Sequence, residues 1–142
     1  MACQLAPNLE LRHMLRHLIH RLFHTDPRHQ IGQQKERQAK RYLSKQGLLH
    51  IASNVRFKFG ELDLVMHDKH QDCLVFVEVR YRSSSAFGDA IESVSDAKMR
   101  RLELAAEAFI QKQSRWQHSS YRFDIIAWQG ALKQPTWLKD VS

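Results

Sequence analysis

Two acidic residues interrupt apolar, strand-like runs in the segment GELDLVMHDKHQDCLVFVEVRYR, which spans residues 60–82. Asp63 stands in the first run, Glu78 stands in the second, and Arg80 follows two residues later. Successive side chains of a strand point to opposite faces, so Asp63 and Glu78 approach each other if the two runs pair as a hairpin. Two ionised carboxylates in a partly dry site repel each other and lose hydration, which destabilises the fold unless a cation compensates them.

A divalent cation would account for these two acids, because Mg²⁺ and Mn²⁺ bind carboxylate and backbone oxygens and keep several waters. In phosphodiester hydrolysis such an ion holds the phosphate and activates the attacking water, and a nearby cation such as Arg80 stabilises the developing charge. We therefore predict a Mg²⁺ or Mn²⁺ site at Asp63 and Glu78. The spacing also allows a second interpretation, in which the two acids form ion pairs with Arg56, Arg80 or Arg82.

The elements that must position these residues follow from hydrophobic periodicity and turn residues. We expect, in order, a helix over 30–46, strands over 48–57, 61–67 and 73–81, a helix capped by Ser95, and a strand over 121–128. The third strand (CLVFVEVRY) is apolar enough to be central and buried on both faces. The order of helix, three strands, helix and strand favours an α/β fold in which helices pack on a mixed sheet.

Composition narrows the class of protein. The 142 residues suit one compact domain with a short appendage, and the net charge of +7 should attract polyanions, of which nucleic acid is the first candidate. The two cysteines, Cys3 and Cys73, form neither a disulfide framework nor a C-x-x-C metal motif, which favours a reducing compartment. The sequence contains no run of about 18 consecutive apolar residues, which is the length that a membrane-spanning helix needs. We expect a soluble, cytoplasmic protein that has no membrane partner.

The segment from Leu9 to His24 predicts a separate amphipathic helix, in which leucines and histidines occupy opposite faces. The leucines are Leu11, Leu15, Leu18 and Leu22, and the histidines are His13, His17, His20 and His24. Two histidines four residues apart can chelate Zn²⁺ or Ni²⁺. Because no carboxylate or cysteine follows at matching spacing, docking through the leucines onto the domain or onto a protein partner is the simpler interpretation.

Six separated pieces of the sequence occur in an order typical of a known family. They are Gly32 with Glu36, SNVRFKFGELDLV, FVEVRYR, the pair Phe87-Gly88, Lys98, and RFDIIAW. Together, over about residues 30–128, they resemble the YraN family of small, uncharacterised bacterial proteins. That family is similar to the restriction-endonuclease-like, PD-(D/E)XK superfamily, which also includes Holliday-junction resolvases and tRNA-splicing endonucleases.

The resemblance implies a restriction-endonuclease-like αβββαβ core with a mixed sheet flanked by helices, to which the N-terminal amphipathic helix is added. We accordingly expect a basic, His-rich helical appendage over 1–28, a nuclease-like domain over 29–130 and a C-terminal tail over 131–142. Within the tail, only Trp137 suggests that the chain folds back onto the domain.

The resemblance also assigns roles to individual residues. Glu36, Asp63 and Glu78 would take the acidic positions, and Val79 would add its backbone carbonyl to the metal. Arg80 would stand where the superfamily's motif has lysine. Arginine stays protonated and cannot act as a base, so Arg80 would hold the phosphate or the attacking water instead.

Basic residues near these elements could contact backbone phosphates without reading sequence. We call this set the basic rim: Arg56, Lys58, Arg82, Lys98 and Arg101. A solvated charged surface is the alternative interpretation of the same residues. Arg122 and Asp124 share one face of the last predicted strand, and we interpret them as a structural pair near the sheet's edge, with a catalytic role as the alternative.

The favoured function is a divalent-metal-dependent, nuclease-like protein that hydrolyses phosphodiester bonds in DNA, with branched or damaged DNA in recombination or repair as candidate substrates. The alternative is a non-catalytic or weakly catalytic nucleic-acid-binding module with the same fold. An adaptor that binds a protein partner through the N-terminal helix is compatible with either. The sequence favours DNA over RNA only weakly, and it leaves open whether a homodimer forms.

Overall fold

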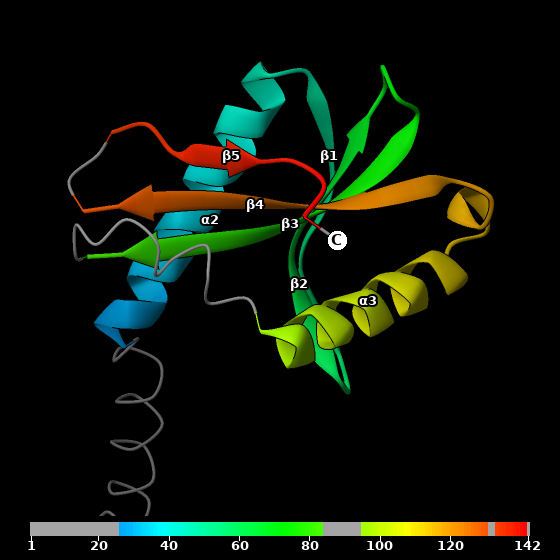
Figure 1. Ribbon diagram of the computed structural model, residues 1–142, viewed down its shortest axis with the longest axis horizontal. Helices are drawn as coiled ribbons and strands as arrows, with labels where there is room; N and C mark the ends of the chain where they lie inside the picture. Colours follow the sequence, from blue (N-terminus) through cyan, green and yellow to red (C-terminus); the bar gives the residue numbers. More distant parts are fainter. Residues whose placement is uncertain (1–25, 84–94, 131–132, 142) are drawn as a thin grey trace, which may run out of the picture. The chain divides into compact units, whose positions relative to one another are not determined.

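The computed structural model describes residues 26–83, 95–130 and 133–141 (Figure 1). The chain divides into two compact units, Met1–Ile31 and Gly32–Ser142, and the second unit contains the sheet. The predicted helix over Leu9–His24 and the pair Phe87-Gly88 lie outside the described residues.

The order of elements confirms the predicted α/β class and is consistent with the αβββαβ core. The elements are α2 (Pro27–Lys45), β1 (Leu48–Phe57), β2 (Gly60–Asp68), β3 (Cys73–Arg82), α3 (Asp96–Gln111), the 3-10 helix η1 (Ser114–Trp116), β4 (Ser120–Gln129) and β5 (Thr136–Leu138). Helix α2 begins three residues earlier than expected, because Pro27 suits a first helical turn and Asp26 accepts a hydrogen bond from the Arg28 N–H at 3.0 Å.

A five-stranded mixed sheet with the order β1-β2-β3-β4-β5 holds the domain together. The pairs β1/β2, β2/β3 and β4/β5 are antiparallel, and β3/β4 is parallel. Strand β3 is central, as predicted, and its residues Leu74, Val75 and Phe76 are at most 1% exposed. Trp137 does fold back, as part of the short edge strand β5.

Two apolar cores form on the sheet, one with each helix. Ala39 and Leu43 of α2 pack in a cluster with residues of β2, β3 and β4, namely Leu64, Met66, Val75, Val77, Ile126 and Trp128. Leu102, Ala106 and Phe109 of α3 pack in a second cluster, which includes Val65, Leu74, Phe76 and Phe123. Because neighbouring β3 side chains belong to different clusters, α2 and α3 cover opposite faces of the sheet (Figure 1).

A recognisable residue marks the end of α2, and another marks the start of α3. Gly47 follows α2 with a φ of 96°, a left-handed conformation that glycine adopts without strain. Ser95 caps α3, because its Oγ accepts a hydrogen bond from the Lys98 N–H at 3.3 Å. This cap fixes the first turn of α3, and therefore the backbone position from which the Lys98 side chain extends.

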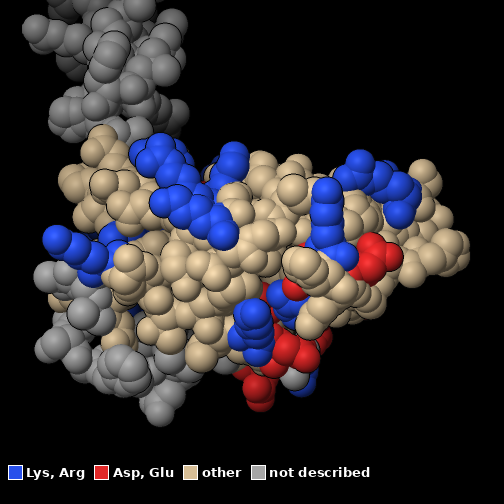
Figure 2. All heavy atoms as spheres, turned by 90° about the horizontal axis from the view of Figure 1, so that it is seen from above, with Lys and Arg blue, Asp and Glu red and all other residues tan. Residues whose placement is uncertain are grey.

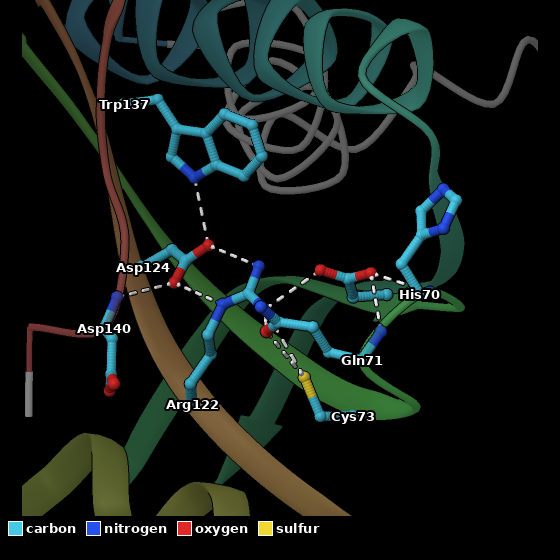
Figure 3. Close-up of polar contacts among 8 residues, drawn as sticks. His70, Gln71, Cys73, Arg122, Asp124, Trp137 and Asp140 are labelled. Atoms are coloured by element: carbon cyan, nitrogen blue, oxygen red, sulfur yellow. Dashed lines mark hydrogen bonds and ion pairs between the residues drawn. The ribbon is translucent and has the colours of Figure 1, made fainter.

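A buried polar network ties the ends of the central strands to the C-terminal segment (Figure 3). Arg122 Nε donates to Asp124 Oδ1 at 3.0 Å, and Arg122 Nη1 donates to Asp68 Oδ2 at 3.0 Å. Asp124 also accepts hydrogen bonds from Trp137 Nε1 and from the Asp140 N–H, each at 3.0 Å. The interpretation of Arg122 and Asp124 as a structural pair is confirmed. We call Asp68, Gln71, Cys73, Arg122, Asp124, Trp137 and Asp140 the Arg122 network.

The charges within this network stabilise one another. Burial works against the charged form of Asp68, but hydrogen bonds from Arg122 and from two backbone N–H groups hold its pKa below the ordinary value. Burial likewise opposes the charge on Arg122, yet the bonds to Asp124 and Asp68 raise its pKa. Among the helices that the structure describes, none is long and apolar enough to cross a membrane.

Candidate functional site

Strands β2 and β3 stop pairing where the two candidate acids begin. Their antiparallel ladder runs from Asp68 opposite Cys73 to Leu64 opposite Val77, so Asp63 and Glu78 are the next residues along each strand. Beyond the ladder, the Val79 N–H donates to Asp63 Oδ2 at 2.9 Å. A side-chain carboxylate therefore takes over where the backbone hydrogen bonds end, and it holds the two strands together at the site.

The environment of Asp63 opposes its negative charge. Burial is the largest cause, and repulsion from Glu78 and Glu36 adds to it, while the bond from Val79 and the charge of Lys98 act in the opposite direction. The result raises the pKa of Asp63 from 3.8 to about 7. At neutral pH, without a cation beside it, this carboxyl group is therefore close to half protonated.

Glu78 is buried with only one of its two oxygens neutralised. The residue is 6% exposed, and its Oε1 lies 2.9 Å from Lys98 Nζ and 3.2 Å from Arg80 Nε. The contact with Arg80 meets an ion-pair distance but not hydrogen-bond geometry. Among the described residues, Glu78 Oε2 and Arg80 Nε have no hydrogen-bond partner. Such orphaned buried polar atoms are uncommon in folded proteins and point to a missing partner.

Lys98 lies in this site rather than only on its rim. The sequence assigned it to phosphate contacts, whereas the structure pairs its ammonium group with Glu78. Arg80 occupies the motif position of lysine, but the ammonium group that reaches the acids comes from the first turn of α3. The Ser95 cap was the one signal in the sequence that placed Lys98 at a helix start.

Glu36 lies on α2 and acts on Asp63 by electrostatic repulsion. It is partly buried on α2 and raises the pKa of Asp63. It also lines a hollow of about 160 Å³ that includes Arg37, Lys40 and Leu64. Within the described ranges, no three or more His, Cys, Asp or Glu side chains form a group able to hold a metal ion. The structure therefore brings two of the three predicted acids together.

A small hollow beside Glu78 is not a substrate pocket. It has a volume of about 10 Å³ and is lined mainly by apolar side chains, among them Leu62, Phe76, Met99 and Leu102. A space of this size holds at most one water molecule.

The residues of the basic rim differ in their surroundings. Arg56 forms an exposed ion pair with Glu61 at 3.3 Å. Arg101 lies close to the β1–β2 turn, which contains Lys58, because a Cβ on Gly60 would be 3.1 Å from the Arg101 carbonyl oxygen. Arg82 is exposed at the end of β3. In the view of Figure 2, Lys and Arg side chains spread over the face, whereas Asp and Glu side chains gather mainly in one region.

Helix α2 is strongly basic, although none of the predicted phosphate contacts lies on it. Its basic residues after Gly32 are Lys35, Arg37, Lys40, Arg41 and Lys45, and Glu36 is its only acid. The basic residues on both sides of Glu36 are the sequence signal for a cationic surface on this helix.

Comparison with known proteins identifies relatives of this chain. A family model described as "Uncharacterised protein family UPF0102" matches residues 35–128. A UPF0102 protein of Pseudomonas putida is 49% identical over 112 residues, covering 77% of this chain and 89% of the relative. UPF0102 proteins of Shewanella sp. (strain ANA-3) and Vibrio parahaemolyticus are 46% and 40% identical, covering 78% of this chain and 96% and 90% of the relatives. These names state no activity.

Proposed function

Since this chain belongs to the uncharacterised protein family UPF0102, we propose its function from the chemistry of its own site. This membership confirms the resemblance to the YraN family, which is the same family. The proposal is a divalent-metal-dependent, nuclease-like protein that hydrolyses phosphodiester bonds in nucleic acid, with DNA as the favoured substrate. The observation that carries it is the buried, unpartnered Oε2 of Glu78 beside Asp63, whose pKa is raised to about 7.

The residues present fit a hard divalent cation. Asp63 and Glu78 would hold it through carboxylate oxygens, the ligands that Mg²⁺ and Mn²⁺ prefer. A cation there would offset the repulsion that raises the pKa of Asp63, and it would give Glu78 Oε2 a partner. The hydrogen bond from the Val79 N–H holds the Asp63 carboxylate in place, which supports its assignment as a metal ligand.

The remaining side chains divide the work of phosphodiester hydrolysis between them. The ion, when bound, supplies Lewis acidity to the phosphate and lowers the pKa of the attacking water. Arg80 and Lys98, both within 3.2 Å of Glu78 Oε1, would stabilise the negative charge that builds up on the phosphate. Lys98 would also orient the water, the role that the superfamily's motif gives to a lysine at the position of Arg80.

A second candidate function is a nucleic-acid-binding module without efficient chemistry. It is favoured by the pairing of Lys98 with Glu78, since this ammonium already neutralises one oxygen that a metal would use. It is also favoured by Glu36, which the described structure does not bring into a three-acid group.

Cleavage assays distinguish the two functions. Purified protein is incubated with linear, flapped and four-way DNA and with matched RNA, in Mg²⁺, Mn²⁺ or EDTA. We expect cleavage that requires the metal and that falls by roughly 100-fold or more in Asp63→Asn and Glu78→Gln, because each variant removes a charged ligand. Glu103→Gln, an exposed acid on the same helix as Lys98, is the matched control and should retain the wild-type rate.

Lys98→Met tests the assignment of the ammonium group within the same assay. We expect it to lower the cleavage rate while nucleic-acid binding persists, whereas Arg80→Lys should retain cleavage. If wild type cleaves nothing in either metal but still binds nucleic acid, the binding module is the better function. If wild type and Asp63→Ala bind Mn²⁺ with equal affinity, the assignment of Asp63 as a metal ligand is wrong.

A further inference from the structure

A basic groove lies between α2 and the end of β4, apart from the two acids. Its volume is about 600 Å³, within the range of ligand-binding clefts. Four of its lining residues are cationic, namely Lys35, Arg41 and Lys45 of α2 and Lys133 of the segment after β4, and none is acidic. The buried Trp128 contributes to its wall.

Lys35 is held in position inside this groove. Its Nζ donates to Gln38 Oε1 at 3.2 Å and lies 5.1 Å from the ring centroid of Tyr81 and 5.2 Å from that of Trp128. Cation–π contacts of this kind attract an ammonium group without neutralising it. The groove therefore has a fixed positive charge at its wall, with a hydrogen-bond donor to spare for a ligand.

The other three cations, Arg41, Lys45 and Lys133, are exposed. In the part of the chain that the structure describes, no Asp or Glu forms an ion pair with any of the four, in contrast to Arg56, Lys98 and Arg122. Like charges that share a groove repel one another, and a polyanion is the ligand that relieves this repulsion. A row of phosphates matches several cations spread along a helix better than a single small anion does.

The groove also adjoins the end of β3. Gly130, which lines it, donates its N–H to the carbonyl oxygen of Arg82 at 2.8 Å. Arg82 follows Glu78 and Arg80 on the same strand, so the groove begins where that strand ends. Arg82 is exposed, so a further cation lies next to this end of the groove.

We propose that this groove binds successive phosphates of one nucleic-acid strand along the face of the sheet that α2 covers. The inference rests on the proposed function for the identity of the polyanion. It adds a binding surface on α2 that is distinct from the basic rim. On this surface, positive charges would hold the phosphate backbone of the nucleic acid without contacting the bases.

Binding measured without chemistry tests the groove. Fluorescein-labelled single-stranded and duplex DNA are titrated by anisotropy in EDTA, over a series of salt concentrations. The groove variant carries Arg41→Gln, Lys45→Gln and Lys133→Gln. The control carries Lys69→Gln, Lys112→Gln and Arg115→Gln, which removes the same charge from exposed positions outside the groove. All six positions are exposed, and thermal melting confirms the folding of each variant.

We expect the groove variant to bind at least about tenfold more weakly at 0.1 M salt, and its salt slope to fall by about two to three, since each lost phosphate contact removes about 0.7–0.9. The control should bind within a few-fold of wild type. If both variants lose the same affinity for DNA, the effect comes from net charge alone, and the proposal that the groove binds nucleic acid is wrong. Displacement of the DNA from wild type by inorganic pyrophosphate would assign the groove to a small anion instead.

The outcomes separate this inference from the proposed function. If wild type binds DNA and the two variants behave alike, the groove fails while the metal site stands. If wild type binds no nucleic acid at all, both fail. Loss of cleavage in Asp63→Asn with unchanged binding concerns the acids alone.

Discussion

Asp63 performs two tasks that conflict in the metal-free protein. Its Oδ2 accepts the Val79 N–H and so joins β2 to β3, yet burial and Glu78 raise its pKa to about 7. Below its unfolded-state pKa of 3.8 the group is neutral in both states and costs nothing. As the pH rises from there to about 7, only the unfolded state releases the proton, so stability falls across this window.

Asp63→Asn should therefore stabilise the metal-free protein at pH 8, because asparagine keeps an acceptor for Val79 and carries no charge. We expect a gain on the order of 1–3 kcal/mol in the free energy of unfolding, which disappears near pH 4. Urea unfolding in EDTA at both pH values measures it, with Glu103→Gln as an exposed control. Lower stability of Asp63→Asn at pH 8 would show that the carboxylate is favourably held.

Among single residues, the acids were predictable and their cationic partner was not. Alternation along two neighbouring strands is enough to bring Asp63 and Glu78 together, because antiparallel pairing fixes which residues face each other. The contact of Lys98 with Glu78 depends on how a helix twenty residues later approaches the sheet, and no local pattern encodes that approach. The salt bridge of Arg56 with Glu61 is of the first kind, because it follows from the β1–β2 register, in which the two residues face each other.

At the scale of elements, the approach of α3 to the β1–β2 turn sets the geometry of the site. Gly60, the first residue of β2, lies so close to α3 that a Cβ would stand 3.1 Å from the Arg101 carbonyl oxygen and 3.6 Å from its Cβ. Lys98 lies one turn earlier on the same helix. A small residue at position 60 therefore allows α3 to carry Lys98 to Glu78.

Gly60→Ala should destabilise the fold by about 1–3 kcal/mol, because the added methyl group forces α3 away from the turn. Gly32→Ala is the matched control: no atom lies within 4 Å of its added Cβ, and alanine in a helix should stabilise by about 0.5–1 kcal/mol. Thermal or urea unfolding of both variants tests the contrast. An unchanged or higher stability of Gly60→Ala would mean that α3 moves without cost.

Most helices and strands were predictable from the spacing of apolar residues and from turn and cap residues. Strand β5 was not, and it shows what such patterns miss. Strand β5 has only three residues, all partly buried, so neither length nor alternation could reveal it. It forms because Trp137 reaches Asp124 and pairs with β4 through tertiary contacts. The start of α2 at Pro27 is ambiguous in the sequence, because proline occurs both at helix breaks and in the first turn of a helix.

At the scale of the whole domain, the Arg122 network replaces apolar packing where β2, β3, β4 and the C-terminal segment meet. Arg122 and Asp124 are 8% and 1% exposed, so neither charge is solvated by water. Arg122 forms ion pairs with both Asp124 and Asp68, so the charges of the two acids depend on this one cation. Buried pairs of this kind add little net stability when complete, but they are costly to break.

Arg122→Met should lower the free energy of unfolding by about 3–5 kcal/mol at pH 7, because Asp68 and Asp124 lose their cation. The deficit should shrink as the pH falls below 3.8, since the lowered pKa of Asp68 stabilises only while that group is ionised. Urea unfolding at pH 7 and pH 3.5 measures both effects. Arg115→Met, at an exposed position, is the control, and a loss below about 1 kcal/mol in Arg122→Met would contradict the assigned role.

The parallel pairing of β3 with β4 also bears on how the chain reaches this structure. Strands β1, β2 and β3 are joined by short turns, whereas β4 returns to β3 across 47 residues, from Cys73 to its partner Ser120. Pairing at such a separation is slow compared with closing a hairpin. In every state in which β4 has not yet docked, the most apolar strand of the chain presents an unpaired edge, on which other chains can add. The strand that positions Glu78 is thus also the one most exposed to aggregation during folding.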